Sequence, residues 1–190
     1  MVLEVPECRD AAEVFAVVGD HRAVTYNPTD FVSGLQEANK LIQMWLHRWV
    51  AHDYGYWCVR ETWTGRIMGY CGMNRMHING WPARSLIARF HPDVWGLEYV
   101  TEAVMAALIC AGTHSGDGSV VARTRPVNLA SRTVALKLCL RRDPGRDERG
   151  PDGIDEYSVT VRRDDRCSRR RSAVEGEIKL SRRCSLFSRM

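Results

Sequence analysis

Apolar residues recur with a helical period over residues 35–50, and this is the most regular pattern in the chain. They return every three to four residues, singly or as adjacent pairs, which places them along one side of an α-helix. Ser33 and Gln36 are expected to form a capping box at its start. Its tryptophans are predicted to lie in the core, because a continuous apolar stripe is typical of any packed helix. The apolar positions are Leu35, Ala38, Leu41, Ile42, Trp45, Leu46, Trp49 and Val50.

Three further segments have helical patterns. Asp10, with Glu13 three residues later, predicts a capped helix that runs to about Val18. Residues 98–111 place a set of small and branched apolar residues on one helical face. Residues 128–140 form the last predicted helix.

Strand-like runs separate these helices. The segments 56–62 and 66–73 are joined by Thr64 and Gly65 and predict an antiparallel hairpin. A polar connection containing Gly80 and Pro82 follows. The alternation of helices with strands around a hairpin predicts an α/β (α+β) fold with a central mixed, mostly antiparallel sheet flanked by helices. The remaining predicted strands are residues 3–5, 85–90, 119–124 and 156–161.

Length and hydropathy limit the possible architectures. The chain has 190 residues, of which 45% are hydrophobic. It is long enough to bury one hydrophobic core but too short for two domains, each with a core of its own. Its apolar runs are shorter than the roughly 18 residues that a membrane span needs. The first residues lack the basic start and apolar stretch of a secretory signal. We therefore expect a soluble, cytoplasmic protein with no membrane partner.

The cysteines and histidines do not indicate a metal site. The seven cysteines are scattered, odd in number and without a C-x-x-C pair, which argues against both a disulfide framework and a zinc site. Among the six histidines, His47 and His52 are five residues apart, so they do not share one helix face as a ligand pair would. No metal is expected.

Positive charge is concentrated at the end of the chain. Residues 162–190 carry ten Lys and Arg against four Asp and Glu, whereas residues 1–161 carry 17 against 19. We therefore divide the chain into a domain at 1–161 and a basic, Arg- and Ser-rich extension at 162–190. The extension has few large apolar residues and is expected to be a solvated appendage. The alternative is an anionic partner such as RNA, and charge indicates a nucleic-acid partner only there.

A loop between a strand and a helix is the first candidate for chemistry. Val94, Trp95, Gly96 and Leu97 precede the predicted helix 98–111. Unpaired N–H groups and the positive end of the helix dipole favour a phosphate at such a place. Many strand-to-helix turns with a glycine bind nothing, so the loop alone does not establish a site.

Two linked segments carry a resemblance to a known family. HPDVWGLEYVTEAV, followed some thirty residues later by RPVNLASRTVALKLCL, resembles the paired signatures of GNAT N-acetyltransferases. The first resembles their pyrophosphate loop and helix, and the second their N-x-x-S segment and the helix ending in K-L-G-F. The chain is most similar to the branch that contains the ribosomal-protein N-terminal acetyltransferases. The likeness extends over nearly all of residues 1–161.

The resemblance implies roles for individual residues. Backbone groups of Arg89 and Phe90 would pair with the pantetheine arm of acetyl-CoA as an added strand. Asn128 would contact the same arm, and Ser131 would protonate the leaving thiolate. Asn128 could instead be a turn residue, and Ser131 a residue that satisfies helix N-terminal donors. The pyrophosphate would be surrounded by Trp95, Gly96, Leu97 and Tyr99.

Three positions depart from the family pattern. Glu98 replaces the second loop glycine and puts a carboxylate where the pyrophosphate is expected, which should weaken binding unless Glu98 turns to a cation. Cys139 replaces the glycine of K-L-G-F, and Leu140 its phenylalanine. A covalent route through Cys139 is disfavoured, because nothing nearby in sequence would activate the thiol.

The base that must deprotonate an amine is not obvious. Strand 85–90 contains no carboxylate. His91 at its end and Glu61 on the hairpin are the candidates, although such residues are more often structural.

The resemblance therefore implies an N-acetyltransferase that moves an acetyl group from acetyl-CoA to a primary amine, either a protein N-terminus or a small molecule. The alternative is a catalytically weak module of the same fold that binds acyl-CoA or a protein partner, and a basic-tailed nucleic-acid adaptor is the third possibility. The acceptor stays open, as does the choice between monomer and homodimer.

Overall fold

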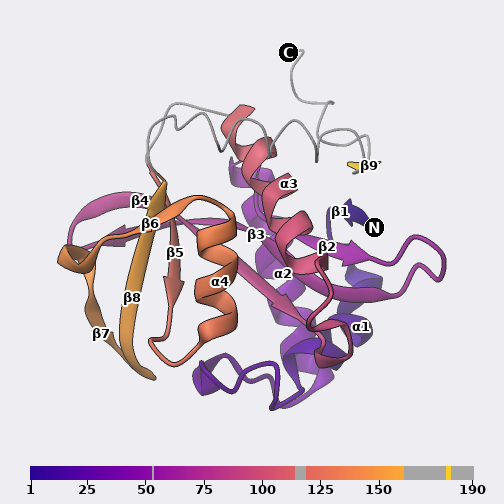
Figure 1. Ribbon diagram of the computed structural model, residues 1–190. Helices are drawn as coiled ribbons and strands as arrows, with labels where there is room; N and C mark the ends of the chain where they lie inside the picture. The colour runs from indigo at the N-terminus through magenta and orange to yellow at the C-terminus, as the bar shows by residue number, and fades with distance from the viewer. Residues whose placement is uncertain (53, 114–118, 161–178, 181–190) are drawn as a thin grey trace.

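The computed structural model describes residues 1–52, 54–113, 119–160 and 179–180. One sheet runs through the molecule, with the strand order β6-β8-β5-β4-β3-β2-β1-β9, and β7 pairs with the other end of β8 (Figure 1). The pairs are antiparallel except for β4 with β5 and β1 with β9. The predicted mixed, mostly antiparallel sheet flanked by helices is confirmed.

The helices are α1 (Ala11–Val18), α2 (Leu35–His52), α3 (Tyr99–Thr113) and α4 (Leu129–Lys137). Short 3-10 turns lie at Cys8–Asp10, Pro28–Asp30, Pro92–Val94 and Pro144–Arg146. The strands are β1 (Val2–Glu4), β2 (Tyr56–Arg60), β3 (Ile67–Ile78), β4 (Trp81–Phe90), β5 (Val120–Thr124), β6 (Leu140–Arg142), β7 (Glu148–Gly150), β8 (Gly153–Thr160) and β9 (Lys179–Leu180).

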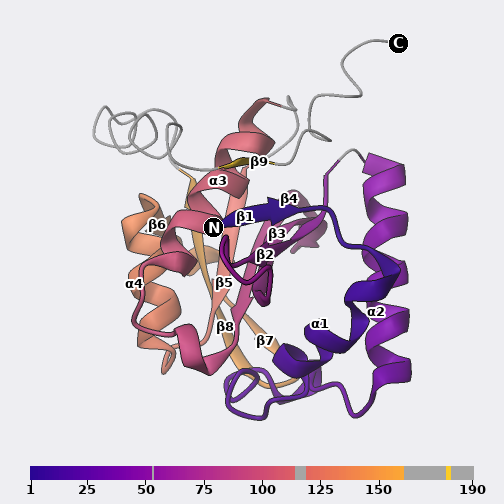
Figure 2. The same cartoon turned by 90° about the vertical axis from the view of Figure 1, so that its right-hand side faces the viewer.

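Helices cover both faces of the sheet. Figure 2 shows α1 and α2 on one side and α3 and α4 on the other. The α3 side holds the larger core cluster, in which Val104 and Leu108 are buried against Trp57, Phe90 and Val120. The α1 and α2 side holds a second cluster around Ile42 and Trp45. The sheet is thus apolar on both faces, as its buried strands require.

The tryptophans of α2 are part of the protein core, as predicted. Trp45 is 1% exposed and packs edge-on against Tyr56. Trp49 is partly buried, and its indole N–H donates to the carbonyl oxygen of Tyr56 at 2.9 Å. Both residues attach α2 to the sheet.

Both predicted capping boxes are wrong in detail. The carboxylate of Glu37, rather than Gln36, accepts hydrogen bonds from the backbone and hydroxyl of Ser33. Asp10 accepts from the backbone N–H of Glu7 and from Arg60, while Glu13 accepts from the backbone N–H of Ile67. The carboxylates of Asp10 and Glu13 therefore bind Arg60 and the backbone of Ile67, both outside the helix, instead of forming the predicted capping box.

β2 and β3 form the predicted hairpin, and β3 and β4 form a second, longer hairpin that was not predicted. β3 and β4 pair from Gly69 with Phe90 to Ile78 with Trp81. Most of the predicted polar connection, residues 74–84, is strand, and its turn is formed by Asn79 (φ 49°) and Gly80 (φ 79°), which both have left-handed backbone. An Asn-Gly pair is the preferred sequence of a two-residue turn that follows the twist of the strands.

The end of the chain differs from the prediction in two places. α4 stops at Lys137, because Leu138 and Cys139 turn the chain into β6. Most of the predicted extension, at 162–190, lies outside the described residues. Within it, Lys179–Leu180 pairs in parallel with Val2 and Leu3 as β9. The boundary after residue 161 therefore stays a prediction.

Cys139 provides a test of backbone strain. It has φ 59°, the left-handed region in which a side chain is unfavourable and glycine is preferred after a helix. Replacing Cys139 by Gly should raise the free energy of unfolding by about 1 kcal/mol. Urea denaturation of the variant measures the change.

Cys139→Ala is the matched control, because it removes the thiol and keeps the Cβ. If the Gly variant is no more stable than the Ala variant, the left-handed backbone at Cys139 is not strained.

Candidate functional site

The two parallel strands at the centre of the sheet separate partway along their length. β4 and β5 pair only from Arg84 with Val120 to Leu86 with Ala122. Residues 87–90 of β4 continue alongside β3, and residues 123–124 of β5 continue alongside β8 (Figure 1). We call the opening between these two strand ends the split.

The edge of β4 that faces the split keeps backbone groups without a strand partner. The backbone N–H of Arg84 donates towards β5, to Ser119, whereas that of His91 donates towards β3, to Met68. Because backbone groups alternate along a strand, Ala88 and Phe90 face the split and Arg89 faces β3. An added extended ligand would therefore meet Ala88 and Phe90 rather than the backbone of Arg89.

The loop after β4 closes one end of this edge. The indole N–H of Trp95 donates to the carbonyl oxygen of Phe90 at 2.9 Å, while the Trp95 side chain stays half exposed. Gly96 has φ 77°, and a Cβ there would meet nothing within 4 Å. The glycine is thus favoured by its backbone conformation rather than by lack of space. Leu97 is exposed, and Tyr99 starts α3 and packs on the core.

Glu98 does turn to a cation. Both its carboxylate oxygens accept from Lys137 Nζ, at 2.6 and 2.8 Å, which joins the start of α3 to the end of α4. The hydrogen bond from Lys137 is the main cause that lowers the pKa of Glu98, so the carboxylate is ionised at neutral pH. The negative charge at the helix end is therefore matched by a positive one. Lys137 belongs to the same K-L-x-L segment as Cys139.

Asn128 and Ser131 lie together at the start of α4. Asn128 is the N-cap, and its Oδ1 accepts the backbone N–H of Ser131 at 3.0 Å. Within the described part of the chain, the Ser131 hydroxyl makes no hydrogen bond. The capping role of Asn128 is thus observed, and the hydroxyl of Ser131 is available to a ligand.

The two candidate bases lie in different surroundings. His91 directly follows β4. Its Nδ1 accepts the backbone N–H of Asp93 at 3.3 Å and lies 3.2 Å from the Asp93 carboxylate. Glu61 lies in the β2–β3 turn, where its carboxylate accepts the hydroxyl of Thr64 at 2.5 Å. His91 is therefore next to the split in the chain, whereas Glu61 closes a turn.

Burial makes Cys58 and Cys71 poor nucleophiles. Burial raises the pKa of the Cys58 and Cys71 thiols far above the usual range, so both stay protonated. Across the residues that the structure describes, no three His, Cys, Asp or Glu side chains gather as a metal site would require. Among the described residues, no helix is both long enough and apolar enough to cross a membrane.

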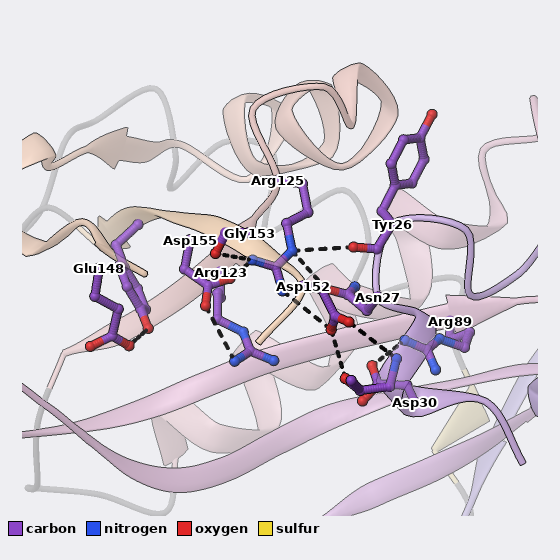
Figure 3. Close-up of polar contacts among 12 residues, drawn as sticks. Tyr26, Asn27, Asp30, Arg89, Arg123, Arg125, Glu148, Asp152, Gly153 and Asp155 are labelled. Carbon is purple, nitrogen blue, oxygen red and sulfur yellow. Dashed lines mark hydrogen bonds and ion pairs between the residues drawn. The ribbon is translucent and has the colours of Figure 1, made fainter. Parts of the chain in front are cut away.

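A charged network that no sequence pattern predicted lies on the other side of the split. Asp30 reaches Arg89 of β4 from the α1–α2 loop, with Oδ2 accepting from Nη2 at 2.6 Å. Arg125 and Asp152 follow β5 and precede β8, and Figure 3 shows them beside the same loop. Asp30 and Arg89 are 59 positions apart in the chain, and Arg125 and Asp152 are 27 apart. No local sequence motif could therefore predict either contact.

Comparisons with known proteins agree with this geometry. A family model described as an acetyltransferase (GNAT) domain matches residues 1–141. An uncharacterised protein of Bacillus subtilis, YkkB, is 28% identical over 137 residues, which cover 70% of this chain and 76% of YkkB.

Solved structures share the fold. The ribosomal-protein-S5-alanine acetyltransferase of Vibrio fischeri superposes with a TM-score of 0.67 at 12% identity, over 85% of this chain and 93% of its own. The microcin C7 self-immunity acetyltransferase MccE, solved with acetyl-CoA and AMP, superposes with a TM-score of 0.67 at 15% identity, over 84% and 91%.

The Glu98–Lys137 pair can be tested by a double-mutant cycle on coenzyme A binding. Lys137→Met should weaken binding about three- to tenfold, because it leaves an uncompensated carboxylate at the start of α3. Glu98→Gln should tighten binding, because it leaves the lysine to the phosphates. The double variant should lie between the two single variants, and calorimetry at low and high salt measures all four proteins.

Glu102→Gln, one turn further along α3, is the control for a general effect of charge at this helix end. An equal effect of Glu102→Gln and Glu98→Gln, or unchanged binding in Lys137→Met, would show that the pair does not control the cofactor site.

Proposed function

The chain belongs to the GNAT acetyltransferase family, and we propose that it transfers an acetyl group from acetyl-CoA to a primary amine. The acceptor is a protein N-terminus or a small-molecule amine. The observation that carries the proposal is the split: an unpaired strand edge at Ala88 and Phe90 that leads directly to the N-terminus of α3.

The residues around the split fit the parts of the cosubstrate. The backbone of Ala88 and Phe90 offers donors and acceptors to the amide groups of the pantetheine arm. The segment from Trp95 to Tyr99 offers the helix N-terminus to the pyrophosphate, with Glu98 neutralised by Lys137. Asn128 lies at the start of α4, whose helix packs against β5 on the same side as α3 (Figure 2).

Ser131 is the proposed proton donor. The amine nitrogen attacks the thioester carbon, the new C–N bond forms, and the C–S bond breaks with its electron pair on sulfur. The Ser131 hydroxyl protonates that sulfur and regains a proton from solvent. Its half-buried position and the absence of another hydrogen bond among the described residues support this role.

His91 is the better candidate for the base that takes the amine proton. In the observed arrangement Nδ1 accepts the backbone N–H of Asp93, so Nε2 carries the ring proton. The tautomer in which Nδ1 donates to the Asp93 carboxylate would leave Nε2 to accept the amine proton. Glu61 remains the second candidate, but its carboxylate already binds Thr64.

A binding module without turnover is the second proposal, because Glu98 and Cys139 stand where the family pattern has glycine. The two proposals share cofactor binding and differ in catalysis, so the following measurements separate them.

Acetyl-CoA should bind and stabilise the protein. A ligand present at a hundred times its dissociation constant adds about 2.7 kcal/mol to the free energy of unfolding. A thermal shift with acetyl-CoA, and none with adenosine at the same concentration, is the expected result. No shift at millimolar acetyl-CoA would contradict both the enzyme and the module.

Ser131→Ala should lower kcat about tenfold to a thousandfold and leave the dissociation constant of acetyl-CoA nearly unchanged, because the proton is transferred only in the transition state. Steady-state kinetics on an amine panel and calorimetry measure the two quantities. A variant that loses about 1 kcal/mol of stability and keeps its kcat would show a structural role for Ser131. Asn128→Ala, which removes the observed cap, gives the reference for such a loss.

A further inference from the structure

Arg125 is the centre of the charged network beside the α1–α2 loop (Figure 3). Its side chain is 5% exposed although it carries a full charge. Nε donates to the carbonyl oxygen of Tyr26 and to Oδ1 of Asn27, at 3.2 and 3.1 Å. Nη1 donates to the carbonyl oxygen of Gly153 at 2.9 Å. Arg125 thus connects the α1–α2 loop to the start of β8.

Two carboxylates lie beside Arg125, and Arg123, 3.7 Å from Asp155, supplies the second positive charge of the group. Asp155 Oδ1 lies 2.9 Å from Nη1, and Asp152 Oδ2 accepts from Nη2 at 3.4 Å. Asp152 also accepts from the backbone and the hydroxyl of Thr29, at 3.3 and 2.6 Å. The guanidinium is therefore surrounded by acceptors from two chain segments, the α1–α2 loop and the start of β8, which only its planar set of five donors can serve together.

The α1–α2 loop is hydrogen-bonded to residues on both sides of the split. Asn27 and Thr29 are tied to the β5 and β8 side through Arg125 and Asp152, and Asp30 is tied to Arg89 of β4. Three residues of chain extend at most about 10 Å. The loop is thus held across the gap between the two diverging strands.

A hollow of about 350 Å³ lies where this loop meets the start of α4 and the start of β8. Its walls are mostly apolar and consist of Tyr26, Pro28, Pro126, Val127 and Ile154, with Arg125 and Asp152 also lining it. Val127 and Ile154 are 71% and 54% exposed, so apolar surface faces solvent. Val127 directly precedes Asn128, the residue expected beside the pantetheine arm.

We propose that Arg125 is a positioning residue for the acceptor: it holds the α1–α2 loop across the split and shapes the hollow, which takes the apolar group that an acceptor amine carries. The inference rests on the proposed function and deepens it. The charged groups in the hollow are neutralised by one another, so its free surface is apolar. It therefore favours a primary amine with an aromatic or aliphatic neighbour over a polyamine.

Binding can be tested apart from turnover. Phenethylamine and putrescine are titrated into the full chain, free and saturated with coenzyme A, while methyl and amide NMR signals are followed. Phenethylamine should shift the methyl signals of Val127 and Ile154, and putrescine should bind more weakly. Shifts confined to other residues, or putrescine binding as well as phenethylamine, would overturn the inference.

Substitutions separate positioning from simple stability. Arg125→Met and Arg125→Lys should both weaken phenethylamine binding about tenfold or more and leave coenzyme A binding unchanged, because an ammonium cannot serve the fork of acceptors. Arg123→Lys is the matched control, since Arg123 is more exposed and lies 3.7 Å from Asp155. Amine binding retained in Arg125→Lys would overturn the positioning role.

A second pair of variants tests the hollow without the buried charge. Ile154→Ser should weaken phenethylamine binding about five- to tenfold by removing apolar contact. Val50→Ser, at an exposed apolar position on α2, should have no effect. Equal effects of the two substitutions would overturn the hollow as the site. Amine binding at the hollow without any coenzyme A binding would leave the hollow as an amine site but defeat the proposed acetyl transfer, and with it the role of Arg125 in positioning an acceptor.

Discussion

The divergence of β4 from β5 is the constraint on which the rest of the structure depends. Two strands that pair over three residues and then separate leave backbone donors and acceptors that no neighbouring strand satisfies. A sheet interior tolerates such an edge only where water, a side chain or a ligand supplies the partners. Trp95 supplies one by donating to the carbonyl oxygen of Phe90, and the edge at Ala88 remains for an extended ligand.

The two sides of the split are built from different interactions. On the α3 side, helix termini meet, and the exposed pair of Glu98 and Lys137 sets the charge beside the loop. On the other side, buried ionic contacts around Arg125 fix a loop that has no regular secondary structure of its own at Tyr26 and Asn27. Exposed pairs are weak and sensitive to salt, whereas a buried charge with its partners specifies one arrangement. The cosubstrate would need only a suitable charge beside its phosphates, which an exposed ion pair can supply. A selective acceptor site would need a loop fixed in one arrangement, which the buried contacts of Arg125 supply.

Local patterns predicted what local physics decides. The periodic stripe around Ile42 and Trp45 placed α2, and the run after His91 placed the loop that starts α3, because burial and chain turns act over a few residues. The predicted capping box of Asp10 and Glu13 was wrong, because their carboxylates bind Arg60 and the backbone of Ile67, which are far away in the sequence. The contacts of Arg125 with Asn27 and Gly153 join segments far apart in the chain, and a single sequence holds no local trace of them.

Glu98 and Cys139, which both stand where the family pattern has glycine, are accommodated in different ways. Glu98 brings a charge to a helix end that favours anions, and Lys137 from another helix cancels it, so the adjustment is electrostatic. Cys139 keeps the left-handed backbone that a glycine would adopt without strain, so there the adjustment is conformational and its strain stays in the fold. Lys137 and Cys139 are two residues apart at the end of α4. The turn at Cys139 therefore also ends α4 at the point where Lys137 can reach Glu98. A substitution at Cys139 should alter the Glu98–Lys137 ion pair, and a substitution at Lys137 should alter the stability of the turn.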